Sequence, residues 1–253
     1  MTTRHRTAPA DTRMMTIVHE ALRRDLRRAR RALTAPEPPQ DRQRIALADH
    51  LGWMMRFLEH HHHGEDVGLY PAVRERDPAA TPLLDAMDAQ HQAIGPAMAG
   101  VVTAADAFRA GDSERAPLLA AIDRLESVLL PHLRQEEDDA MPVVAATLTS
   151  AELAAIDHEY FVKPKSLREL GREGHWLLDG LGPEDRSVVT GTVPPVPKFV
   201  LLHAFARGYR RRSAACWGRP DRRVARTGRA VVDVDDPPDA VWAIASDVTR
   251  VGE

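Results

Sequence analysis

Apolar residues recur every three to four positions through most of the first 150 residues, the spacing of one face of an α-helix. Short polar or proline-containing turns separate four such segments. The expected helices span about residues 12–33, 41–76, 82–110 and 114–148. Short connections make neighbouring amphipathic helices antiparallel, so the pattern predicts an all-α protein with an up-down four-helix bundle over residues 10–148.

Beyond the bundle the helical pattern continues but is more often interrupted. Residues 149–217 predict a helical extension packed on the bundle: a helix opening at Ser150 and broken at Pro164, a short helix, and a last helix from Pro197 to about Trp217. Residues 218–228 have the composition of a linker. The start of the third bundle helix combines Thr81 as a cap with Pro82 at the first helical position.

The pattern changes again in residues 229–253, where valines alternate with acidic residues and a short helical segment follows. One strand and one short helix cannot bury a core of their own. We therefore expect this short α+β tail to be the start of an incomplete domain.

Composition narrows the classes of function. The chain is 43% hydrophobic and 28% charged with a formal net charge of −3, which is typical of a globular protein and argues against nucleic acid as a partner. Arginine-rich stretches at 23–31 and 207–229 are interpreted as solvated helix faces. A single cysteine, Cys216, suits a reducing compartment, and no segment predicts a signal peptide or a membrane span, so a cytoplasmic location is expected.

Candidate chemistry lies within the apolar stripes of all four bundle helices, where histidine and glutamate occupy positions that should face the core. Two of the helices carry a histidine and a glutamate one turn apart. The candidate metal ligands are His19, His61, Glu65, His91, His132 and Glu136. The neighbours His60, His62 and His63 cannot all face inward, and at least His60 and His63 are expected at the surface or rim.

Each candidate has a simpler interpretation when it is taken alone. A single histidine in a helix stripe is more often a hydrogen-bonded core residue, and a His-x-x-x-Glu pair is often only a pair within one helix. Six such groups on the inner faces of four consecutive helices would need several separate compensations if no metal were bound. They are too many donors for one tetrahedral zinc ion and enough for two ions that share bridging carboxylates.

Two motifs extend this pattern into a resemblance. They are His61-His62-His63-Gly64-Glu65-Asp66 with Leu69-Tyr70-Pro71, and His132-Leu133-Arg134-Gln135-Glu136-Glu137 with Met141-Pro142. Over about residues 10–148 the chain resembles the hemerythrin-like, or HHE cation-binding, domains, with His19 and His91 matching the single histidines of the first and third helices. The resemblance implies a non-haem, carboxylate-bridged site for two iron ions, with dioxygen or another diatomic molecule as its ligand.

One position departs from the oxygen-carrying members of that family, which place a second histidine one turn after the third-helix ligand. Here that position is Gly95, which argues against simple reversible oxygen carriage; Asp88 is the nearby residue that would compensate.

The tail from Arg229 to Glu253 resembles the opening strand and helix of START-like, polyketide-cyclase-type domains, which implies an apolar small molecule as a further ligand.

Three functions follow from these observations. The first is a di-iron binding protein that senses or handles dioxygen, nitric oxide, or iron and redox status. The second is a di-iron enzyme that reduces peroxide or oxidises a substrate, and the third is a metal-free helical adaptor. The chain carries no glycine-rich phosphate loop, nucleophile elbow or zinc-protease helix, so a non-enzymatic role is favoured.

Overall fold

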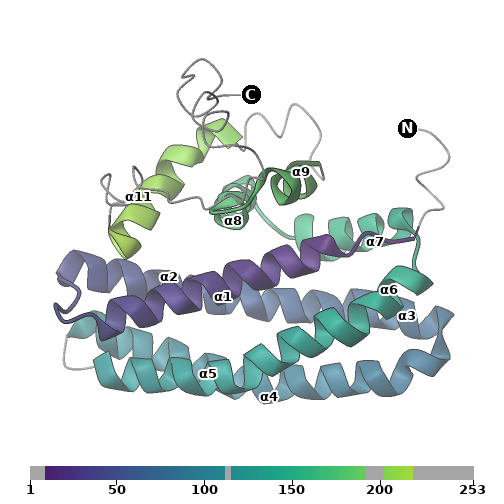
Figure 1. Cartoon of the computed structure of the whole chain (residues 1–253), viewed down its shortest axis with the longest axis horizontal. Coiled ribbons are helices and arrows are strands. Elements are labelled where there is room, and N and C mark those ends of the chain that lie inside the picture. The colour runs from purple at the N-terminus through teal and green to yellow at the C-terminus, as the bar shows by residue number, and fades with distance from the viewer. Residues whose placement is uncertain (1–8, 112–114, 192–201, 219–253) are drawn as a thin grey trace, which may run out of the picture. The chain divides into compact units, whose positions relative to one another are not determined.

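The computed structural model describes residues 9–111, 115–191 and 202–218. Four long helices lie side by side, and each runs antiparallel to the next along the chain (Figure 1). These helices are α1 (Arg13–Thr34), α2 (Asp41–Gly64), α4 (Thr81–Ala110) and α5 (Arg115–Gln135). The predicted all-α bundle is thus confirmed.

Two short helices, α3 (Tyr70–Arg76) and α6 (Met141–Thr147), prolong α2 and α5 at the same end of the bundle (Figure 1). A 3-10 turn over Pro78–Ala80 leads into α4. Thr81 is the first residue of α4 and not its cap, a correction to the prediction. The preceding turn is capped instead by Asp77, whose carboxylate accepts a hydrogen bond of 3.1 Å from the amide of Ala79.

A π-helical turn joins each long helix to its prolongation. The turns η2 (Glu65–Leu69) and η5 (Glu136–Ala140) begin at the glutamates of the two His-x-x-x-Glu pairs. Each turn is closed by a hydrogen bond from an amide to the carbonyl five residues earlier. The residue after the donor of that bond is a proline, Pro71 or Pro142. A proline ring clashes with the carbonyl four residues before it in a regular helix, and the wider turn relieves that conflict.

Two apolar layers fill the bundle, one on each side of a central polar layer. The larger layer includes Leu22, Leu58 and Ile94, and the smaller one, under α3 and α6, includes Tyr70 and Met87. Along each helix the histidines and glutamates fall between residues of the two layers. The polar residues are therefore enclosed by hydrocarbon on both sides.

The residues that follow the bundle form a helical extension. Its elements are α7 (Ser150–Ile156), the π-helical turn η6 (Asp157–Val162), α8 (Leu167–Leu178), α9 (Pro183–Gly191) and α11 (Ala206–Trp217). Residues 219–253, which include most of the expected linker and the whole α+β tail, lie outside the described residues. The described part contains no β-strand.

The extension is tied to the bundle through the buried Asp25 of α1. Its Oδ2 accepts hydrogen bonds of 2.8 Å from the indole of Trp176 in α8 and from His50 in α2, while its Oδ1 accepts one from Arg24. Burial opposes ionisation of Asp25, but these donors hold its pKa well below the usual value. Trp176 is itself fully buried against Phe57, so α8 belongs to the core of the bundle.

The turn η6 packs directly against the helix that carries the first motif. A Cβ atom built on Gly64 would lie 2.5 Å from the ring of Phe161, and one on Gly68 would collide with the ring of Tyr160. Only glycine allows this close approach. The extension therefore covers the bundle where the polar layer lies. No helix within the described ranges has the length and apolarity needed to cross a bilayer.

Substitution of Gly68 tests this packing. Gly68→Ala should lower the free energy of unfolding by roughly 1–3 kcal/mol, the usual cost of overpacking, because the added methyl group displaces the Tyr160 ring. Gly95→Ala is the matched control, since Gly95 is exposed in α4 with nothing near its Cβ position. It should raise stability by about 0.5–1 kcal/mol through helix propensity. Urea denaturation measures both, and equal effects would contradict the proposed close packing.

Candidate metal centre

All six residues expected to face the core meet at one place in the polar layer. They come from α1, from the α2–η2 and α5–η5 junctions, and from α4. His91 is the most exposed of them, at 7%. The six are His19, His61, Glu65, His91, His132 and Glu136.

Each glutamate faces histidines from two different helices. The two oxygens of Glu65 lie 3.1 Å from His61 Nε2 and 3.7 Å from His91 Nε2. A single oxygen of Glu136, Oε2, lies 3.3 Å from His19 Nε2 and 3.7 Å from His132 Nε2. Both carboxylates thus stand between two groups of imidazoles, which is the position of a bridging ligand.

Three of the histidines are held from behind by a residue of another helix. The Nδ1 atom of His19 lies 2.8 Å from Glu137, and that of His91 lies 2.6 Å from Asp66. His132 Nδ1 is 3.0 Å from Gln90 Oε1. In each ring the Nε2 atom is left facing the centre. This is the arrangement that fixes the tautomer and orientation of metal-binding histidines.

A seventh donor, His62, was not among the predicted site residues. Its side chain is buried and its ring stacks on that of His91 at 4.0 Å, while His60 is half-buried and His63 is exposed, as expected. Donor nitrogens of His62, His91 and His132 lie within 4.8 Å of one another. The third imidazole near His91 therefore comes from α2 and not from α4.

Neither of the two positions considered for the missing α4 histidine lies inside the centre: Gly95 faces solvent and Asp88 lies at the rim. Gly95 is exposed, so a side chain there would meet solvent. Asp88 lies at the rim beside Asp66 and is ion-paired with Arg74. His62 is thus the buried donor that offsets the sparser histidine set of α4, while Asp88 forms a second group of candidate ligands with Asp66 and His91 at the rim.

Most of the donor atoms that face the centre lack hydrogen-bond partners among the described residues, and the Nε2 atoms of His91 and His132 have only each other, at 3.2 Å. The atoms without a partner are Nε2 of His19, His61 and His62, both carboxylate oxygens of Glu65, and Oε2 of Glu136. Each buried polar atom left unpaired costs about 1–3 kcal/mol. A cation would satisfy all of them at once, and the mixture of imidazole and carboxylate suits a transition metal. The residues present therefore fit a metal centre.

Burial controls the protonation of three of the histidines in the metal-free chain, whereas at His19 burial is outweighed by Glu136 and Glu137, which raise its pKa. Burial lowers the pKa of His61 to about 3, with help from the nearby His19, and it lowers the pKa of His132 to about 4 and that of His62 well below the usual value. These rings are thus held neutral, as ligands must be.

The two glutamates respond to burial in opposite ways. Burial and the neighbouring Glu136 raise the pKa of Glu65 well above its usual value. Burial also opposes ionisation of Glu136, but the close approach of His19 holds its pKa below the usual value. Tyr70 donates a hydrogen bond of 2.8 Å to Glu136 Oε1, which leaves Oε2 for the centre. Metal binding is therefore expected to release the proton of Glu65.

Comparison with known proteins agrees with this geometry. The family model described as the hemerythrin HHE cation binding domain matches residues 10–144, more than half of the chain. No curated protein and no solved structure matched the chain.

The depressed histidine pKa values make the metal-free bundle sensitive to acid. Below the unfolded-state value near 6.5, the unfolded chain binds protons that the folded His61, His62 and His132 do not, so stability falls as the pH drops toward about 4. Glu65 and His19 oppose this loss, because their pKa values are raised and the folded chain therefore holds protons on both. The net loss should be roughly 1–3 kcal/mol per pH unit between pH 6 and 5.

Chemical denaturation of the metal-free protein across this range measures the slope. His61→Leu removes one of the buried titrating groups and should flatten the slope, whereas the exposed His63→Ala should leave it unchanged. A free energy of unfolding that does not change with pH in this range would show that the histidines are not buried in the neutral form.

The role of His62 can be tested against its exposed neighbour. His62→Ala should weaken binding of a divalent probe such as Co²⁺ by at least about tenfold, because one donor is lost from the group around His91. His63→Ala changes the adjacent, exposed residue and should leave the affinity unaltered. If titrations give equal affinities for the two variants, His62 is a packing residue and not a ligand.

Proposed function

The chain belongs to the hemerythrin HHE cation-binding domain family, and on that basis we propose that it binds two iron ions in the centre of its bundle and uses them to sense or handle a diatomic molecule such as dioxygen or nitric oxide. The single observation that carries the proposal is the group of buried donors that face one another in the bundle: the Nε2 atoms of His19, His61 and His62 and the oxygens of Glu65 have no hydrogen-bond partner among the described residues, and the Nε2 atoms of His91 and His132 have only each other, at 3.2 Å. Burial of such a set has no other evident purpose.

The number of ions is argued from the two glutamates. His19 and His61 form one group of imidazoles, with ring centroids 5.8 Å apart. The other group consists of His62, His91 and His132. Glu65 and Glu136 each contact both groups. Two ions joined by these carboxylates would use all seven donors, as in other carboxylate-bridged sites of helix bundles.

Each residue around the centre has a definable task. Bound iron would supply the redox-active centre at which a diatomic molecule is held. Glu137, anchored by Arg23 at 2.8 Å, keeps His19 oriented, and Asp66 does the same for His91. The phenol of Tyr70 stabilises the ionised form of Glu136 by a hydrogen bond and closes the side of the centre toward α3.

Access to the centre favours a very small ligand. None of the seven donors is more than 7% exposed, and the rings of Phe57 and Phe161 pack within 6.0 Å of His61. An organic substrate could reach the donors only if the helices separated, whereas a diatomic molecule needs little more than fluctuations of side chains. This enclosure supports sensing or handling of a diatomic molecule over oxidation of a larger substrate.

Stoichiometry provides the decisive measurement. Protein loaded anaerobically with ferrous iron and then desalted should retain about two ions per chain, the number expected for a carboxylate-bridged bundle site. Glu65→Ala should reduce this number, since it removes a carboxylate that contacts both histidine groups. Retention of one ion by the unaltered chain would contradict the dinuclear proposal.

Exposure of the loaded protein to dioxygen or nitric oxide should then change its visible absorption spectrum in a saturable manner. Multiple turnovers of peroxide by the same sample would favour an enzyme over a sensor. The exposed variant His63→Ala serves as the control in both experiments, because its side chain lies outside the centre.

A further inference from the structure

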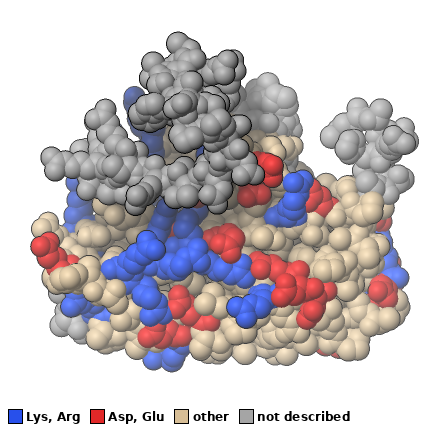
Figure 2. All heavy atoms as spheres, viewed as in Figure 1, with Lys and Arg blue, Asp and Glu red and all other residues tan. Residues whose placement is uncertain are grey.

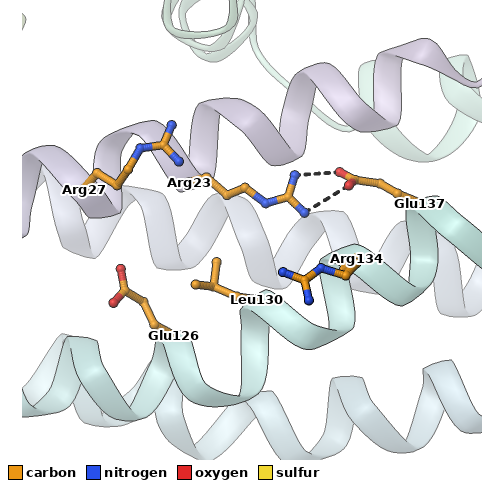
Figure 3. Close-up of a pocket in the computed structure, with 6 residues that line it drawn as sticks. All are labelled: Arg23, Arg27, Glu126, Leu130, Arg134 and Glu137. Carbon is orange, nitrogen blue, oxygen red and sulfur yellow. Dashed lines mark hydrogen bonds and ion pairs between the residues drawn. The ribbon is translucent and has the colours of Figure 1, made fainter.

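A cavity of about 380 Å³ lies between α1 and α5, on the outer side of the residue that orients His19. It is lined by Arg23, Arg27, Glu126, Leu130, Arg134 and Glu137 (Figure 3). Figure 2 shows basic side chains gathered over the middle of this face of the bundle, with acidic side chains among them. None of the seven donors of the metal centre lines this cavity; the two sites share only Glu137, which orients His19, and Arg23, which anchors Glu137.

The two carboxylates of the cavity are already neutralised by partners. Glu126 pairs with Arg30, which lies outside the cavity, and Glu137 pairs with Arg23 at 2.8 Å. Both pairs join α1 to the α5–η5 segment, one at each end of the cavity. The walls are thus held at a defined spacing before any ligand arrives, which is the usual condition of a binding pocket.

Two arginines of the cavity keep unused binding capacity. Arg134 is exposed and makes no hydrogen bond or ion pair with any described residue, and Arg27 has only a contact of 3.7 Å with Glu20. In Figure 3 the guanidinium groups of Arg23 and Arg134 extend from opposite helices toward the cavity. Cationic groups that share a cavity repel one another, and an anion between them would relieve this repulsion.

We propose that this cavity binds a small organic anion, with a phosphate or carboxylate group held by Arg134, attracted also by the positive charges of Arg23 and Arg27, and a short apolar body lying on Leu130. Guanidinium groups present planar pairs of donors that match both kinds of oxyanion. The cavity volume of about 380 Å³ is more than ten times the roughly 30 Å³ that one water takes up in the liquid, which leaves room for a group larger than a single small ion. Leu130 and the hydrocarbon stems of the arginines provide the apolar surface for the remainder of the ligand.

Calorimetric titration of the full chain with phenyl phosphate tests the proposal at low ionic strength. Saturable binding of one equivalent is expected, and Arg134→Ala should weaken it by about tenfold or more. Arg27→Ala should weaken it less, because Arg27 also contacts Glu20. Arg134→Lys should fall between the original chain and Arg134→Ala, since it keeps the charge but not the planar pair of donors.

Arg31→Ala is the matched control, because Arg31 is an exposed arginine of the same helix α1 that does not line the cavity. It removes the same charge and should leave binding unaltered. Leu130→Ser should weaken the binding of phenyl phosphate but not the binding of inorganic phosphate. Iron content and melting temperature should be the same in the original chain and in Arg134→Ala, which separates this site from the metal centre.

Absence of saturable binding by phenyl phosphate would overturn the proposal. Equal losses in Arg134→Ala and Arg31→Ala would also overturn it, because binding would then follow net charge and not the cavity. If Leu130→Ser left the affinity for phenyl phosphate unchanged, the apolar contact would be excluded, and with it an organic ligand.

Discussion

Seven imidazole and carboxylate side chains share the dry centre of the bundle, and the donor atoms that they leave unpaired within the described structure are the constraint on which the rest of the molecule depends. Two apolar layers and the helical extension shield them from water. Shielding of that kind is costly for polar atoms and useful for a metal centre, because a cation recovers the cost and a dry site strengthens every interaction with it.

The metal-free chain reduces this cost through protonation. Burial keeps the rings of His61 and His132 neutral and keeps a proton on Glu65, while Glu136 stays ionised beside His19. Glu136 and Glu137 in turn outweigh burial and raise the pKa of His19, so the buried negative charge of Glu136 lies beside a histidine that favours its positive form. Binding of a cation is coupled to proton release and to the folding stability of the bundle, so metal affinity and acid sensitivity have a common origin.

The region outside the centre is organised around the same residues. Glu137 links His19 to Arg23, and Arg23 in turn forms one wall of the cavity between α1 and α5. Phe161 of the extension packs on Gly64 of the first motif, and Tyr160 packs on Gly68 in the turn η2. The extension packs on one side of the bundle, and ion pairs link its helices on another. Together they hold the donors at fixed positions, as a metal site requires.

Periodicity in the sequence was sufficient to predict the four antiparallel helices and the six donors that face inward, because the side a residue faces depends on its position within one helix. Contacts between helices depend on how the helices are rotated and shifted against one another. The periodicity within a single helix does not determine that rotation or shift. His61 and His62 differ by about 100° around α2, and only the placement of α4 beside α2 brings both rings into the centre.

The same reason applies to the residues that hold the histidines from outside. Asp66 and Glu137 directly follow the two motif glutamates, and this doubling of acids was a signal in the sequence that could have identified them. Their partners His91 and His19 lie on other helices, however, and the π-helical turns shift the register after each glutamate. The sequence by itself determined the inward face of each helix, with the six donors on it; the tertiary structure decided that His62 is also buried and which side chains meet, because those distances are set by packing between helices and not within them.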